Sequence, residues 1–197
     1  MSTGFLLAVE DSLSEAVGKS LLQQLGLSVS QTLGLQGNGY LKTKVGALNQ
    51  VARRLPVLLL TDLDVPNRCP AQLVTQWLPH ARSSGLVFRV AVVEVEAWLI
   101  ADRESLAEFL EISSKRIPRD PDSVAYPKET LVELARASKN RRLREGLAPA
   151  RNSTAKVGPA YNMQLCSYVN TFWDAKRAST ESDSLRRAIN ALDRFCS

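Results

Sequence analysis

The first hundred residues of the chain alternate short apolar runs with amphipathic stretches. Two of the runs, residues 5–9 and 57–61, carry no charged side chain, which is typical of strands buried in a parallel sheet. A third run at 86–93 is rich in β-branched residues, and a weaker alternating pattern covers 27–35. We therefore predict four strands in this part of the chain.

The stretches between these runs have the spacing of helices. Apolar residues recur with a helical period at 13–25, 42–54 and 71–78, and Gly26 supplies a stop after the first of these segments. A further helix is expected to begin near Glu96. This alternation of strands and helices predicts an α/β fold, with a parallel four-stranded sheet flanked by helices and joined by right-handed crossovers.

The pattern changes after Asp102. No convincing strand follows, and a polar, proline-containing stretch at 118–127 reads as a connecting loop. The final segment, 184–195, has the apolar stripe of an amphipathic helix. We predict two parts: an α/β domain at 1–102 and a helical extension at 103–197 that packs on it.

Acidic residues follow two of the predicted core strands. Glu10 comes directly after the strand at 5–9, and Asp62 and Asp64 come after the strand at 57–61, the third in chain order. The carboxyl ends of parallel strands gather at one edge of a sheet, where ligands bind, and an extended backbone would place Asp62 and Asp64 on the same side. If the first and third strands are neighbours, the three carboxylates converge on a hard cation such as Mg²⁺. The simpler alternative is that they cap helices and stabilise turns.

A second acidic pair, Glu94 and Glu96, follows the last predicted strand. Its functional interpretation is a second metal position or a base that orients water. The alternative is that both carboxylates favour the positive end of the following helix. For Asp102 a role as a helix cap is the stronger interpretation.

Composition limits the classes of protein that fit. The chain is 45% hydrophobic, with no apolar stretch long enough to span a membrane, and the N-terminus lacks the basic region of a signal peptide. Its three cysteines lie far apart, so neither a disulfide framework nor a zinc site is expected. A cytoplasmic location is the default expectation.

The net charge of +5 is unevenly distributed. Residues 136–156 are strongly basic, which suits a phosphate-bearing partner such as nucleic acid but equally a solvated helix face. Phosphodiester cleavage also needs positive charge near the phosphate. Lys156, in a loop with Gly158 and Pro159, is the first candidate for that role and Lys128 the second, although either is also compatible with an ordinary surface lysine. The expected contacts to nucleic acid are Arg141, Arg142, Arg144, Arg151 and Lys128.

The order of a strand ending in Glu and a later strand ending in Asp-x-Asp resembles the TOPRIM fold of topoisomerases, primases and OLD-type nucleases over residues 4–102. Residues 94–102, 122–128 and 156–159 resemble, more narrowly, a poorly characterised bacterial TOPRIM-like family considered alongside ATPase partners in phage defence. The resemblance implies that Glu10, Asp62 and Asp64 bind Mg²⁺ (or Mn²⁺), and that Glu10 can also act in acid–base chemistry.

The chain departs from the TOPRIM pattern in two ways. Asp11 stands where a small glycine usually follows the first Glu, and no tyrosine is placed as a topoisomerase would need. The other domains of topoisomerases and primases are also missing. Of the activities that the resemblance implies, a nuclease-like one therefore fits better, although one fold hosts several chemistries.

The sequence therefore predicts Mg²⁺-dependent phosphodiester hydrolysis on nucleic acid, with Glu10, Glu94 and Lys156 as catalytic residues. One alternative is a non-catalytic TOPRIM-like module that binds nucleotide or nucleic acid, or that serves as a subunit of an ATPase complex. Another is an α/β protein whose acidic strand ends only cap helices. The choice between DNA and RNA, and any homo-oligomer, stay open.

Overall fold

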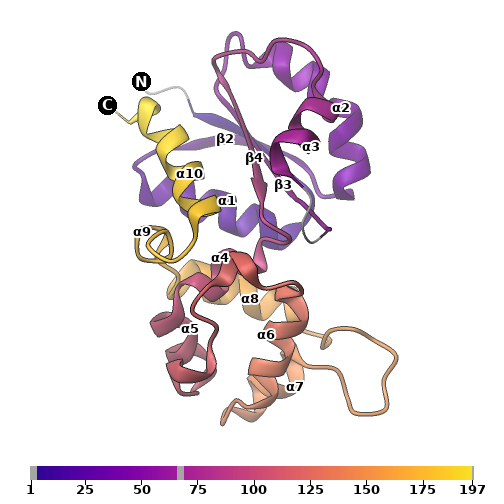
Figure 1. Cartoon of the computed structure of the whole chain (residues 1–197), viewed down its shortest axis with the longest axis vertical. Coiled ribbons are helices and arrows are strands. Elements are labelled where there is room, and N and C mark those ends of the chain that lie inside the picture. The colour runs from indigo at the N-terminus through magenta and orange to yellow at the C-terminus, as the bar shows by residue number, and fades with distance from the viewer. Residues whose placement is uncertain (1–3, 66–68, 197) are drawn as a thin grey trace.

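The computed structural model describes residues 4–65 and 69–196. It confirms the predicted α/β class: four parallel strands form one sheet in the order β2-β1-β3-β4, and helices flank the sheet (Figure 1). β1 and β3 are neighbours, which is the arrangement that the predicted acidic site requires. The strands are β1 (Phe5–Val9), β2 (Val29–Gly34), β3 (Val57–Asp62) and β4 (Leu86–Ala91).

Alternate residues of the strands feed two separate hydrophobic cores. Leu7 of β1 and Leu58 of β3 face α1 (Ser12–Gln24), whereas Leu6 and Leu59 belong to the core shared with α2 (Gly37–Val51) and α3 (Pro70–Trp77). Because both faces of the central strands are covered, each strand reads as an unbroken apolar run. β4 is an edge strand that pairs only with β3.

The second helix begins earlier than its apolar pattern indicates. α2 starts at Gly37, inside the stretch that reads as a glycine-rich loop. Gly34, the last residue of β2, has a φ of +122°, and a Cβ atom there would lie 1.9 Å from the Val9 carbonyl oxygen. Glycine is therefore required at this position, where the loop turns beside the carboxyl end of β1.

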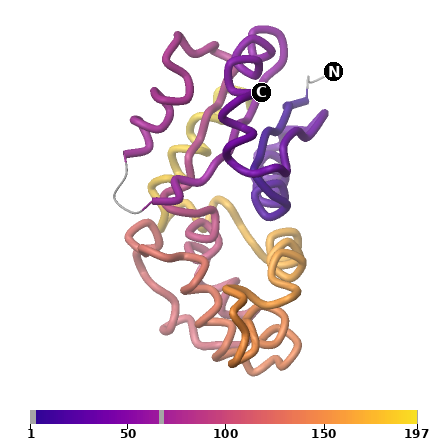
Figure 2. The backbone as a smooth tube through the Cα atoms, turned by 90° about the vertical axis from the view of Figure 1, so that its right-hand side faces the viewer, coloured from indigo at the N-terminus to yellow at the C-terminus, as the bar shows by residue number. Residues whose placement is uncertain are grey.

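The rest of the chain is helical, as predicted, with no strand among its described residues. Figure 2 shows that most of this half extends the molecule along its long axis, away from the sheet, whereas its last helix lies beside the sheet. Its elements are α4 (Glu96–Ala101), α5 (Arg103–Leu110), η1 (Ser114–Arg116), η2 (Pro121–Ser123), α6 (Pro127–Arg136), α7 (Arg141–Leu147), α8 (Tyr161–Thr171), α9 (Ala175–Ala178), α10 (Asp183–Leu192) and η3 (Asp193–Phe195).

The helical half and one face of the sheet contribute to the same hydrophobic core. α8 packs against α1, and α10 returns to the sheet beside β4, so that both ends of the chain lie at the α/β end (Figure 1). None of the described helices combines the length and apolar character that crossing a membrane requires.

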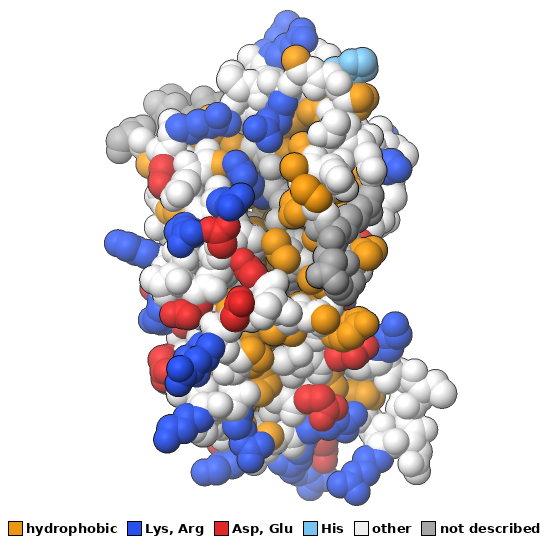
Figure 3. All heavy atoms as spheres, in the orientation of Figure 1, with side chains coloured by type: hydrophobic (Ala, Val, Ile, Leu, Met, Phe, Trp, Pro, Cys, Tyr) orange, Lys and Arg blue, Asp and Glu red, His pale blue; other side chains and the backbone are white. Residues whose placement is uncertain are grey.

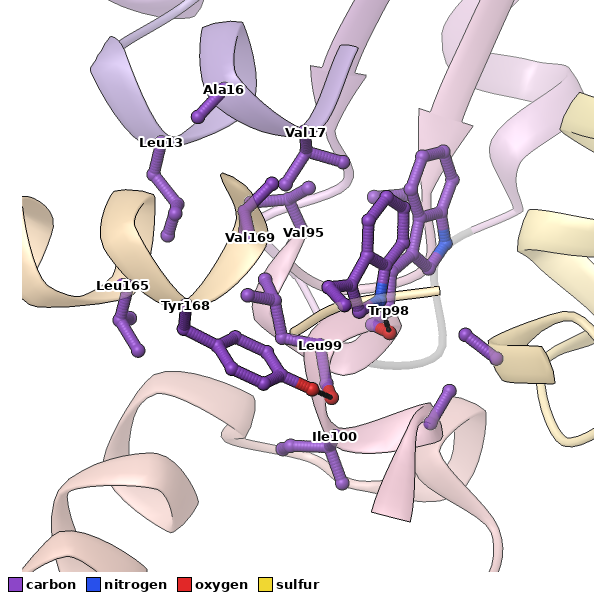
Figure 4. Close-up of a cluster of buried hydrophobic side chains, with 14 of the residues drawn as sticks. Leu13, Ala16, Val17, Val95, Trp98, Leu99, Ile100, Leu165, Tyr168 and Val169 are labelled. Carbon is purple, nitrogen blue, oxygen red and sulfur yellow. Dashed lines mark hydrogen bonds between the residues drawn. The ribbon is translucent and has the colours of Figure 1, made fainter. Parts of the chain in front are cut away.

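α4 lies at the centre of this shared core. All six of its residues are buried, and Figure 4 shows Trp98 and Leu99 in one cluster with side chains of α1 and α8. The Trp98 Nε1 atom donates to Ser184 Oγ at 2.7 Å, and the Tyr168 hydroxyl donates to the Leu99 carbonyl at 3.4 Å. These contacts hold the helix rigidly, and with it Glu96 in its first turn.

Candidate functional site

Glu10 connects two neighbouring strands at the carboxyl edge of the sheet. It follows β1 directly, and its Oε1 atom accepts hydrogen bonds from the Thr61 hydroxyl and, at 2.8 Å, from the backbone N–H of Asp62. Burial raises the pKa of Glu10, while these two hydrogen bonds favour the charged form and oppose the shift. The Glu10 carboxylate is thereby fixed beside the residue that the sequence analysis placed in the same site.

Asp62 joins this point to the segment that follows β4. It is the last residue of β3, and its Oδ1 atom accepts the backbone N–H of Val95 at 2.8 Å. Burial raises the pKa of Asp62 well above its usual range, and the nearby charges of Glu96 and Glu10 raise it further. Acidic residues from three strand ends therefore crowd one edge of the sheet.

Asp64 does not continue the extended geometry that the sequence analysis assumed. β3 ends at Asp62, and Asp64 has a left-handed backbone with a φ of +61°. Its side chain is exposed, and its Oδ2 atom accepts Asn38 Nδ2 at 2.5 Å, while Asp62 is held by Val95. The prediction that an extended strand aligns the two carboxylates is therefore wrong, because the chain turns between them, although the charge of Asp64 still raises the pKa of Asp62.

Glu94 and Glu96 form a second acidic group around a lysine. Lys128 Nζ lies 3.5 Å from a carboxylate oxygen of each glutamate, and the Lys128 backbone N–H donates to Glu94 Oε2 at 2.9 Å. Glu94 thus anchors the first turn of α6 in addition to pairing with the side chain. Burial alone would lower the pKa of Lys128, but the charges of Glu96, Glu94 and Asp62 raise it overall, so the ammonium stays protonated.

Glu96 is the most deeply buried carboxylate of this group, with only 2% of its surface exposed. Its Oε1 atom accepts the Tyr161 hydroxyl at 3.2 Å. Burial raises the pKa of Glu96, Lys128 lowers it, and Glu94 raises it again. A carboxyl group with a raised pKa, next to a protonated lysine, is suited to accepting and releasing a proton.

Asp11, which replaces the small glycine of the TOPRIM pattern, has a structural role. Its side chain accepts the backbone N–H of Ser14 at 2.8 Å and so caps α1. Its charge also raises the pKa values of Glu10 and Asp62. Asp11 therefore caps α1 and adds negative potential to the site.

The acidic edge offers oxygen atoms of the kind that a hydrated divalent ion uses as ligands. Across residues 4–65 and 69–196 no group of three or more Asp, Glu, His or Cys side chains forms a complete metal centre by itself. Mg²⁺, however, is usually bound through one or two carboxylates, with the remaining ligands from water and substrate phosphate. Glu10 and Asp62 provide two such carboxylates, and a cation would favour their charged forms against the burial and the neighbouring negative charges that raise their pKa values.

The remaining predicted residues lie elsewhere. Lys156 and Arg151 are exposed in the loop between α7 and α8, which projects from the helical end of the molecule (Figure 1). In α7, Arg141 pairs with Glu145 at 2.7 Å, and Arg144 Nη1 donates to the Ser138 carbonyl at 2.6 Å. Arg142 is exposed on the same helix. Their contacts to nucleic acid stay predictions, whereas Lys128 is the lysine at the acidic edge.

Three residues of the site were not identified from the sequence: Thr61, Asn38 and Tyr161. Thr61 precedes Asp62 at the end of an apolar run, and its hydroxyl donates to Glu10. The available signal was a polar residue within that run. Tyr161 reaches the site from a segment 65 residues away from Glu96 along the chain. No spacing rule connects two such distant positions.

The raised pKa of Asp62 predicts an unusual dependence of stability on pH. A carboxyl group whose pKa is raised on folding stabilises the protein below its unfolded pKa, about 4, and this stabilisation is lost as pH rises through the folded pKa. Asp62→Asn removes this titration. The free energy of unfolding of the variant should therefore increase relative to that of the wild type as pH rises above about 4. Urea unfolding of both proteins over this pH range measures the difference, and a pH-independent difference would contradict the assignment.

Comparison of the chain with protein-family models, with curated proteins and with solved structures finds no significant match.

Proposed function

We propose that the protein is a metal-dependent nuclease whose active site is the acidic edge formed by Glu10, Asp62, Glu94 and Glu96. The observation that carries the proposal is the pair of hydrogen bonds from Thr61 and Asp62 to Glu10, which brings acidic ends of adjacent strands to one point. The strand order and the positions of these acids support a TOPRIM-type assignment.

Glu10 and Asp62 would hold Mg²⁺ or Mn²⁺. When bound, the ion would polarise a phosphate oxygen and acidify water. Glu96, with its raised pKa, would take the proton of the attacking water, and Tyr161 would keep its carboxyl group oriented through the 3.2 Å hydrogen bond.

Lys128 is the better-placed candidate for stabilising the phosphate. Its ammonium lies between Glu94 and Glu96 and remains half-exposed, so a phosphate oxygen can approach it. Glu94 would orient this lysine, or support a second ion. Asp64 and Lys156 stay in the proposal as residues that substrate binding could bring to the site. The cytoplasmic location, the ATPase partner and the phage-defence role rest on the resemblance alone.

The test is a cleavage screen over plasmid DNA, linear DNA and RNA with Mg²⁺, Mn²⁺ or EDTA. We expect cleavage only with metal, and a loss of at least about 100-fold in Glu10→Gln, because a carboxylate ligand becomes a neutral amide. Glu133→Gln, an exposed glutamate of α6, is the matched control and should cleave like the wild type.

Cleavage that survives in Glu10→Gln would reject the assignment. Metal-dependent binding of nucleic acid without cleavage would support the alternative, a non-catalytic module that acts within a larger complex.

A further inference from the structure

A groove runs along the outer edge of β4, between α3 and α10. Its volume is about 640 Å³, and one wall is apolar, formed by Val74, Leu78 and Phe88. Figure 3 shows Lys and Arg side chains gathered over this part of the molecule, next to hydrophobic side chains on the α3 side. The groove therefore has an apolar wall and a charged wall that holds both arginines and aspartates.

Arg89 lies in the floor of this groove without a partner. It occupies the middle of β4, and its Nε atom is buried with no hydrogen-bond partner among the described residues. A buried donor without an acceptor, on a charged group, costs free energy that native structures rarely leave uncompensated. The position is therefore suited to an acceptor supplied by a ligand.

The charges around Arg89 favour an anion. Burial lowers the pKa of the Arg89 guanidinium, and the positive charges of Arg82, Arg194 and Arg187 lower it further. Arg194 lies outside the groove, but Arg82 and Arg187 line it together with Arg89. An anion between them would remove the repulsion and satisfy the orphaned Nε atom.

The two carboxylates in the wall do not pair with Arg89, although Asp183 neutralises Arg187. Asp183 pairs with Arg186 and, at 2.6 Å, with Arg187. Asp122 accepts hydrogen bonds from Ser182 Oγ at 2.7 Å and from the Ser184 backbone N–H at 2.9 Å. Both acids are engaged at the start of α10, which leaves the charge of Arg89 unpaired.

We propose that this groove binds the phosphodiester backbone of a nucleic-acid strand, with Arg89 and Arg82 on a phosphate and the apolar wall against sugar and base. Arginine matches phosphate geometry through its planar fork of donors, and apolar walls accept bases without regard to sequence. The groove reaches Val92, two residues before Glu94, so a strand lying in it would be led to the acidic edge. Only the delivery of the strand to the acidic edge rests on the proposed function. The binding of the strand in the groove does not.

The test is fluorescence anisotropy of a short, labelled single-stranded DNA in EDTA, over a series of salt concentrations. Arg89→Met keeps the apolar stem and removes the charge, and should weaken binding about tenfold. Each lost phosphate contact should also reduce the slope of log affinity against log salt by about 0.7. The double variant Arg89→Met with Arg82→Gln should show roughly twice the change in slope of Arg89→Met alone.

Arg119→Gln, an exposed arginine outside the groove, is the matched control and should bind like the wild type. Thermal melting without DNA checks the fold: Arg89→Met should melt no lower than the wild type, because it loses an unpaired charge. Unchanged affinity and salt slope in the double variant would overturn the inference. So would a glutamate-rich peptide that binds as tightly as the DNA and loses affinity equally in Arg89→Met, since the groove would then be a peptide site.

The same assay separates this inference from the nuclease proposal. Asp62→Asn should bind DNA normally in EDTA, because it lies outside the groove. Loss of binding in Arg89→Met, together with no cleavage by any protein tested, would keep the groove and reject the nuclease. Normal binding in Arg89→Met, with metal-dependent cleavage that Asp62→Asn abolishes, would do the reverse.

Discussion

Metal-dependent cleavage by an Asp62→Asn variant should fall about a thousandfold below the wild-type rate. The substitution removes one of the two charges that would hold the ion. A thousandfold loss of rate corresponds to about 4 kcal/mol of lost transition-state stabilisation. Asn keeps an oxygen in the place where Asp62 Oδ1 accepts the Val95 N–H at 2.8 Å. The variant should therefore fold, and the loss should appear in the rate constant at saturating substrate.

Asp64→Asn is the matched control for this prediction. Asp64 is exposed on a left-handed turn and hydrogen-bonded to Asn38, so its removal should reduce cleavage by no more than about tenfold. Equal losses in the two variants would show that both aspartates bind the ion and that substrate closes the turn. An Asp62→Asn protein with undiminished cleavage would exclude the acidic edge as the active site.

The strands, and the acidic residues that follow them, were predictable because both depend on the local sequence pattern. Buried parallel strands must be apolar on both faces, and the runs ending at Val9 and Thr61 show this directly. The adjacency of β1 and β3 is not encoded in any period, but it is the condition under which Glu10 and Asp62 meet, and the structure confirms it.

The polar surroundings of the site were not predictable in the same way. Lys128 reaches Glu94 across 34 residues and Tyr161 reaches Glu96 across 65, so their contacts depend on how α4, α6 and α8 pack. The turn at Asp64 is a local event, yet a left-handed backbone at an aspartate has no reliable signature when the preceding strand is so regular. Sequence spacing therefore identified the acids but not the groups that orient them.

The distribution of charge shows the same limit. Counting basic residues drew attention to 136–156, where Arg141 and Arg144 prove to be paired within the helical half. Arg89 stands alone in an apolar strand, and its sequence context gives no sign that the charges of three other arginines act on it. The groove arises only when β4, α3, α10 and the turn before β4 come together.

The second large effect is on stability and concerns Asp102, whose side chain is fully buried between α4 and α5. It accepts hydrogen bonds from Arg177 Nε at 2.6 Å, from Arg177 Nη2 at 2.8 Å and from the backbone N–H of Asp174 at 2.9 Å. Asp102 occupies the expected N-cap position of α5, but its side chain makes no capping hydrogen bond to that helix. Asp102 instead ties the segment around α9 to the core helices.

Arg177→Met should lower the free energy of unfolding by about 3 kcal/mol, because it leaves a buried carboxylate without its counterion. Asp102→Asn should cost less, about 2 kcal/mol, since the half-exposed guanidinium of Arg177 can turn to water and Asn still accepts the Asp174 N–H. Urea unfolding monitored by tryptophan fluorescence measures both. Trp98 and Trp173 are buried near this pair and report its loss.

Arg141→Met provides the control, because Arg141 and Glu145 form an ion pair of similar length that is exposed on α7. Its unfolding midpoint should equal that of the wild type, since water already screens the pair. If Arg177→Met were as stable as this control, the buried carboxylate would have to be solvated or protonated in the native protein. The segment around α9 would then be held by Trp173 and its neighbours alone, and the helical half would depend on packing rather than on a buried charge.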